Sequence, residues 1–311
     1  MKLSWKDSIY LQREQLARLL EQPLKNLAEQ CAQAWGGREQ LNRVLLDGFT
    51  TIPHCKHLYC MDPGGVQICD NIGAGGLVEG HFQRDRSQRP YMQEQIPPWG
   101  FLLSDAYISL IQHHPSLTAL RMVQAGGETL GYLGADFDLR NLPVTAVLYE
   151  EPGYWRQVKG DPAIRRQVFQ QCRIESPLDR NIDQAMSILE ELLTERGVFQ
   201  CQVHFSSSQA TLWTVDEPYH YRILDSEALS DADICLVYPR QSYPANAVIP
   251  QADIVRILDN LQRLRLSDET FYLRTASINI INGMVSVTFS CDGSHYMPYL
   301  EFLLKGTAFW F

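Results

Sequence analysis

Apolar residues recur every three or four positions through residues 3–35 and would share one side of a helix. They are Ile9, Leu16, Leu20, Leu24, Leu27 and Cys31. This period predicts a long amphipathic helix, kinked at Pro23 and ended by Gly36-Gly37. The apolar stripe has two interpretations: it covers the core of its own chain, or it forms the seam of a homodimer.

Strand patterns begin near residue 57. The stretches HLYCM (57–61) and VQICD (66–70) flank DPGG, which predicts a hairpin. Residues 71–100 are rich in glycine, proline and polar residues, and so long a segment inside a compact domain is usually functional or disordered. Two long strands are then expected within 116–137, on either side of Gly126-Gly127.

The second half mixes helices and strands. No clear period appears over 150–176, which is interpreted as a connector, and Ser176 before Pro177 predicts the start of a helix that runs to Gly197. The other expected elements are strands at 198–206, 210–215, 219–224 and 233–238, a helix at 250–264, and a hairpin at 271–290 whose Asn282-Gly283 suits a type I′ turn.

Antiparallel strands mixed with helices predict an α+β fold in both halves of the chain. A length of 311 residues is sufficient for two domains. The predicted boundaries are a first domain at residues 1–150, a connector at 151–175, and a second α+β domain of unknown role at 176–311.

Composition and charge limit the classes of partner that the chain is expected to bind. The net charge of −9 argues against nucleic acid, because phosphate binding needs a basic surface. No apolar run approaches the roughly 18–20 residues of a membrane helix, and the N-terminus lacks the pattern of a signal peptide. We therefore expect no membrane span, a cytoplasmic location, and eight cysteines that are mostly free thiols.

Three further clusters contain residues typical of metal binding, phosphate binding or thiol catalysis. HCKHLYC (54–60) has metal-type ligands at a spacing that matches no zinc site, and NIGAGG (71–76) lacks the Lys-Ser/Thr of a phosphate loop, so no metal and no cofactor are expected. The stretch around Cys291, Asp292 and His295 is interpreted as a structural turn. The alternative is a thiol-dependent hydrolase that uses Cys291 and His295.

The stretch QRDRSQRPYM (83–92) gathers three arginines within six positions of an acidic chain. It is followed by Ser104-Asp105-Ala106-Tyr107 and by the strand pair that ends in Gly134-Ala135-Asp136. Together these motifs, over about residues 3–145, resemble the PDC/Cache family of sensor domains. The resemblance implies a PAS-like antiparallel sheet after a long N-terminal helix, with the arginine-rich segment as the cap of a ligand pocket.

The resemblance also implies roles for particular residues. It assigns a ligand carboxylate to Arg89, Tyr91 and Tyr107, and a ligand ammonium to Asp136. Arg84 stands where amino-acid-binding members have tyrosine, and this extra cation favours a more acidic ligand, such as a dicarboxylate or small organic acid. Without ligand, Arg89 and Asp136 are expected to pair through water.

The residue chemistry alone agrees with an anion site, because arginine can clamp a carboxylate with two parallel hydrogen bonds. The alternative is that Arg84, Arg86 and Arg89 fix the loop by pairing with Asp85, Asp105 or Glu94. The sequence thus predicts a non-enzymatic sensor of an amino acid, amine or small organic acid, which signals to an unknown downstream protein. A protein–protein adaptor with a sensor-like fold is a further alternative.

Overall fold

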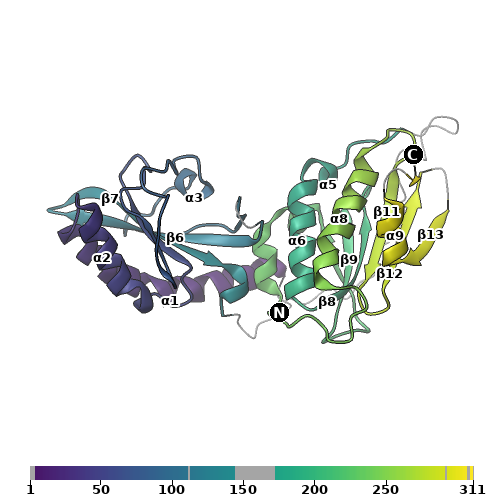
Figure 1. Cartoon of the computed structure of the whole chain (residues 1–311), viewed down its shortest axis with the longest axis horizontal. Coiled ribbons are helices and arrows are strands. Elements are labelled where there is room, and N and C mark those ends of the chain that lie inside the picture. Colours follow the sequence, from purple (N-terminus) through teal and green to yellow (C-terminus); the bar gives the residue numbers. More distant parts are fainter. Residues whose placement is uncertain (1–3, 111–112, 144–171, 291–292, 307–308, 311) are drawn as a thin grey trace. The chain divides into compact units, whose positions relative to one another are not determined.

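The computed structural model describes residues 4–110, 113–143, 172–290, 293–306 and 309–310. The chain divides into two compact units (Figure 1). One unit comprises Lys6–Thr145, and the other comprises Ala146–Phe311 together with Met1–Trp5. No helix in the described part of the chain is both long enough and apolar enough to cross a membrane.

The predicted N-terminal helix is confirmed. Helix α1 spans Trp5–Gln33, contains Pro23, and buries the predicted apolar stripe, including Leu16, Leu20 and Leu24. It ends three residues before Gly36, which lies in the left-handed region at φ 90°. A second helix, α2 (Arg38–Gly48), and a short 3₁₀ turn, η1 (Phe49–Thr51), follow.

The first unit is built on one antiparallel sheet, with strands in the order β3-β2-β1-β7-β6-β4 and with β5 paired to β6. The strands are β1 (His57–Met61), β2 (Asn71–Gly73), β3 (Gly76–Val78), β4 (Phe101–Leu103), β5 (Tyr107–Ile108), β6 (Pro115–Ala125) and β7 (Glu128–Asp138). Figure 1 shows α1 along one side of this sheet and the segment with α3 (Pro90–Gln93) on the other. The α+β class and the element order implied by the Cache resemblance are confirmed.

The long hairpin β6–β7 turns at Gly126 and Gly127, as predicted, and both glycines have positive φ. The first predicted hairpin is confirmed only close to its turn, where Met61 and Gln67 form an isolated antiparallel bridge, Asp62 N donates to Val66 O and Ile68 N donates to Cys60 O; residues 66–70 do not extend this pairing into a strand. The backbone of Gly65 and Gln67 also bonds to residues 83–86. This pairing fastens the arginine-rich segment over the sheet, and β1 takes β2 as its partner.

The second unit has a six-stranded antiparallel sheet in the order β10-β9-β8-β11-β12-β13. Its strands are β8 (Val198–His204), β9 (Gln209–Thr214), β10 (Arg222–Asp225), β11 (Leu273–Asn279), β12 (Met284–Phe289) and β13 (Ser294–Pro298). Its helices are α5 (Pro177–Arg180), α6 (Ile182–Glu195), α7 (Ser226–Ser230), α8 (Gln251–Leu266) and α9 (Tyr299–Lys305). The predicted cap at Ser176 is confirmed, since Ser176 and Asp179 form a capping box.

Three local predictions for this unit are wrong. The predicted helix 176–197 breaks at Asn181 between α5 and α6. Residues Ala232–Val237 form the 3₁₀ helix η3 rather than a strand, because the Asp231 side chain caps it by accepting from Asp233 N. The β11–β12 turn is longer than a type I′ turn: Asn279 pairs with Met284, and only Gly283 has positive φ.

Candidate functional site

A cavity of about 270 Å³ lies in the first unit and is lined by the sheet and the arginine-rich segment. This volume is just below the range of typical ligand pockets, which runs from roughly 300 to 1,000 Å³. All five residues singled out by the sequence line it: Arg84, Arg89, Tyr91, Tyr107 and Asp136. Its other lining residues are Lys56, His57, Asn71, His81, Arg86, Ser109, Leu110, Ser116 and Phe137.

The sheet register sets the floor of this cavity. His57 on β1 and Thr118 on β6 both pair with Asp136 on β7, so the three side chains share one face of the sheet. Tyr59 pairs with Gly134 on the same face, two residues along each strand. A methyl group at Gly134 would lie 2.5 Å from Cε2 of Tyr59, so glycine leaves the space in which the tyrosine ring lies.

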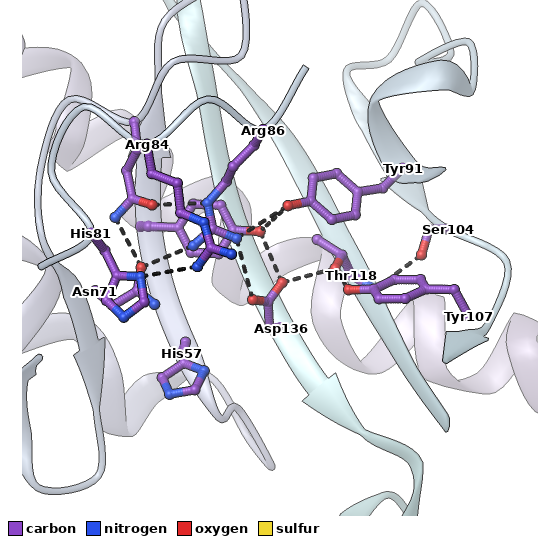
Figure 2. Close-up of polar contacts among 12 residues, drawn as sticks. His57, Asn71, His81, Arg84, Arg86, Tyr91, Ser104, Tyr107, Thr118 and Asp136 are labelled. Carbon is purple, nitrogen blue, oxygen red and sulfur yellow. Dashed lines mark hydrogen bonds and ion pairs between the residues drawn. The ribbon is translucent and has the colours of Figure 1, made fainter. Parts of the chain in front are cut away.

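Asp136 is the centre of a hydrogen-bond network (Figure 2). Its Oδ1 accepts from the hydroxyls of Tyr59 and Thr118, each at 2.8 Å. Because Thr118 donates to the carboxylate, it accepts the bond from the Tyr107 hydroxyl at 2.7 Å. Burial, followed by the nearby carboxylate, raises the pKa of Tyr59 and Tyr107, so both phenols stay protonated and able to donate.

Arg86 is the cation beside Asp136, and sequence reasoning did not assign it a role in the site. Its Nη1 lies 3.8 Å from Asp136 Oδ2, and its guanidinium stacks 3.7 Å over the Tyr59 ring centroid. It also donates to the side chains of Gln67, Asn71 and Tyr91. The cation that forms a direct ion pair with Asp136 is therefore Arg86, which is only 4% exposed, and the expected pairing of Arg89 with Asp136 through water stays a prediction.

Arg84 and Arg89 also line the cavity. Arg84 contacts His81 Nδ1 at 3.2 Å, and Arg89 immediately precedes α3. Within the described residues, neither guanidinium has a carboxylate partner in an ion pair. Burial, reinforced by the charges of Arg86 and Arg89, lowers the pKa of Arg84. The cations therefore repel one another.

The alternative is that acidic residues pair with these arginines and fix the loop. For two of those acids, Asp85 and Asp105, the structure shows other partners. The Asp85 carboxylate accepts from Ser87 N at 2.8 Å. Asp105 forms an ion pair with Arg13 on α1 at 3.3 Å. The loop is held by backbone bonds, including Arg86 N to Gly65 O at 2.9 Å and Gln67 N to Arg84 O at 3.0 Å.

Two histidines and a lysine also line the cavity. Burial lowers the pKa of His57, although Asp136 opposes the shift. Burial and the charges of Arg84 and Arg86 lower the pKa of His81. Lys56 lies 3.8 Å from Asp138, a carboxylate that it shares with Arg140. Both rings are thus neutral near pH 7, and three guanidiniums face the single carboxylate of Asp136 among the described lining residues.

The other sequence clusters have these outcomes. In the part of the chain that the structure describes, no group of three or more His, Cys, Asp or Glu could hold a metal ion. Cys291 and Asp292 lie outside the described residues, so the proposed thiol pair stays a prediction. The His295 ring packs edge-on against Trp310, with centroids 5.2 Å apart.

Comparisons with known proteins gave structural matches only: no family model and no curated protein matches the chain. One similar structure is an extracellular ligand binding receptor from Desulfohalobium retbaense (12% identity, 43% of this chain, 25% of that chain, TM-score 0.35). Another is the sensory domain of the Campylobacter jejuni chemoreceptor Tlp3 with isoleucine bound (14% identity, 43% and 55% coverage, TM-score 0.35).

A third similar structure is the ligand-binding domain of the Pseudomonas fluorescens chemoreceptor CtaA in complex with L-isoleucine (16% identity, 42% and 51% coverage, TM-score 0.31). In all three cases the similarity covers less than half of this chain. The chain in turn spans between 25% and 55% of those solved chains.

Proposed function

We propose that this protein is a non-enzymatic sensor that binds a small molecule bearing a carboxylate, drawn from the amino acids and small organic acids, in the cavity of the first unit. The observation that carries the proposal is the pair of arginines, Arg84 and Arg89, that line the cavity without a carboxylate partner among the described residues. An anion between them would relieve their mutual repulsion and satisfy their donors.

The strength of such a site is adequate for a metabolite. Hydrogen bonds to charged groups contribute about 1.5–3 kcal/mol each. Two or three of them, together with contacts to the rings of Tyr91 and Tyr107, reach the roughly −8 kcal/mol of a micromolar complex. The fixed network around Asp136 holds these rings in place before the ligand arrives, which lowers the entropic cost of binding.

A thermal-shift screen against amino acids, amines and small organic acids tests the proposal. A ligand at 100 times its Kd adds about 2.7 kcal/mol of stability. Arg89→Gln is expected to abolish the shift given by any carboxylate. Arg18→Gln is the matched control, because Arg18 is an exposed arginine of α1 that pairs with Glu14. A carboxylate that stabilises the Arg89 variant as well as the parent would contradict the proposal.

A further inference from the structure

Among the described residues, the one carboxylate that lines the cavity already has protein partners on both of its oxygens. Asp136 Oδ1 accepts two hydroxyl hydrogen bonds, from Tyr59 and Thr118. Its Oδ2 faces the guanidinium of Arg86 at 3.8 Å. A ligand ammonium that approached Asp136 would therefore meet a positive charge of the protein beside its intended partner, and like charges at such distances repel strongly when partly buried.

Arg86 has no room to give way to such an ammonium. It is buried between the Tyr59 ring and the loop, and Gln67, Asn71 and Tyr91 accept its hydrogen bonds. Displacing it would leave a buried guanidinium without partners, which is among the most costly changes in a protein interior. Arg86 thus holds a positive charge beside Asp136, and an ammonium at this carboxylate would lie next to it.

Two anionic groups would neutralise the excess positive charge of the cavity lining. Arg84, Arg86 and Arg89 exceed the single carboxylate of Asp136 by two positive charges among the described lining residues, and Lys56 shares Asp138 with Arg140. In Figure 2, Arg84 and His81 lie on one side of the Arg86–Asp136 pair, whereas Tyr91 and Tyr107 lie on the other. Arg89 directly precedes the helix that carries Tyr91.

We propose, building on the proposed function, that the cavity selects a small dicarboxylate and rejects ligands that carry an ammonium group. One carboxylate binds Arg89 beside the two tyrosines, and the other binds Arg84 beside His81. Arg86 is the specificity-determining residue, because it neutralises Asp136 from within the protein.

Calorimetry of the full chain with four matched four-carbon probes tests this specificity. The probes are succinate, aspartate, butyrate and 4-aminobutyrate. Succinate is expected to bind tightest. Butyrate lacks the second carboxylate and aspartate carries an ammonium that Arg86 repels, so each is expected to bind more weakly by roughly tenfold or more. 4-Aminobutyrate is expected to be the weakest. Aspartate or 4-aminobutyrate binding as tightly as succinate would overturn the inference.

Arg84→Gln locates the second carboxylate. It is expected to weaken succinate roughly tenfold while it changes butyrate less than about threefold. The control Arg18→Gln leaves both unchanged. Equal weakening of the two probes by Arg84→Gln would overturn the two-ended arrangement. If an amino acid bound tightest and its binding depended on Arg89, only this inference would be overturned. If neither dicarboxylates of three to six carbons nor any other screened carboxylate bound, the proposed function would be overturned as well.

Discussion

The guanidinium of Arg86 lies over the Tyr59 ring, and Tyr59 in turn lies over Gly134. This stack explains the small residue two positions before Asp136 in β7 better than any requirement of the backbone, because the φ of Gly134 is not in the left-handed region. Without a side chain at 134, the tyrosine ring reaches the sheet surface and its hydroxyl reaches Asp136. The position of Arg86 therefore depends on a glycine with which it has no direct bond.

Gly134→Ala tests that dependence. The added methyl group would lie 2.5 Å from the Tyr59 ring, so the ring and the guanidinium above it must move. We expect a loss of about 1–3 kcal/mol in unfolding free energy from overpacking, together with weaker ligand binding. Gly75→Ala is the control, because nothing lies within 4 Å of a methyl group there. Chemical denaturation that gives equal stability for both variants would contradict this account.

The two cavity histidines predict a dependence of binding on pH. Their pKa values are lowered in the folded protein, so the neutral rings stabilise it near pH 7, and this contribution is lost as the pH falls below the ordinary value of about 6.5. A bound anion favours the protonated rings. Affinity for a carboxylate is therefore expected to rise from pH 8.0 to pH 6.0, by up to about tenfold per pH unit for each proton taken up.

The double variant His57→Gln/His81→Gln is expected to flatten this pH dependence in calorimetry. Protonation of the ligand itself affects the variant and the parent equally, so it cannot account for a difference between them. The control is His204→Gln, which removes a partly buried histidine of lowered pKa from β8 in the other unit. If the double variant kept the slope of the parent, the histidines would not be the source of the proton uptake.

Sequence reasoning brought Arg84, Arg89, Tyr91, Tyr107 and Asp136 to one cavity, but it did not find the part played by Arg86. Three arginines in six irregular positions have no period that could tell which one is buried. The choice depends on the long-range backbone bonds that hold residues 83–86 against Gly65 and Gln67. A glutamine and an asparagine as acceptors for an arginine carry no signal in a single sequence.

At the scale of elements, the first unit links its long helix directly to the wall of the cavity. Arg13 on α1 donates to the carbonyls of Leu103 and Ser104 at 2.7 and 2.8 Å. These residues end β4 and lead into β5, which carries Tyr107. The Ser104 hydroxyl accepts from Thr118 N on β6, so the same short segment is tied to the helix and to the sheet.

Arg13→Ala is expected to cost about 1–3 kcal/mol in unfolding free energy, because two carbonyls lose a charged donor. It is also expected to weaken ligand binding by loosening the segment that holds Tyr107. Asp105→Asn removes an ion-pair partner of Arg13, but the Asp105 side chain is 81% exposed, so we expect a loss of less than about 0.5 kcal/mol in unfolding free energy. Denaturation curves in which Asp105→Asn costs as much as Arg13→Ala would show that the ion pair, and not the carbonyl bonds, is what matters.

The reliability of sequence reasoning about elements followed the strength of the local signal. The period of α1 and the glycine turn of β6–β7 are strong signals, and both predictions are confirmed. The apolar run of residues 233–238 fits a buried strand or a buried helical turn equally well. The capping residue Asp231 was the signal that could have decided it. Residues 66–70 differ: Gln67 forms the predicted bridge to Met61, but Val66 pairs with Asp85, which lies in a distant loop that no short-range rule identifies.

At the scale of the whole molecule, the chain has a net charge of −9 and yet places four of its 27 lysines and arginines, Lys56, Arg84, Arg86 and Arg89, around one small cavity. The two facts are compatible, because interactions between exposed charges are screened beyond about 8–10 Å at ordinary ionic strength, whereas those within a partly buried cavity are screened much less. The cavity lies wholly within the first unit. The role of the second unit, and a homodimer through α1, stay predictions.

The placement of the cavity predicts where a ligand stabilises the protein. Saturating carboxylate is expected to slow hydrogen exchange of amides within residues 6–143 by a free energy approaching the 2.7 kcal/mol available at 100 times Kd. Strands β1, β6 and β7 should show the largest effect, because Asp136, Tyr59 and Thr118 connect them beneath the ligand. Amides of residues 172–290 are expected to exchange at unchanged rates, since none of their side chains lines the cavity.

Arg89→Gln with the same carboxylate is the control and should remove the protection. Protection of equal size in both units would mean that they open as one cooperative body, and it would assign the second unit a direct part in the response to the ligand.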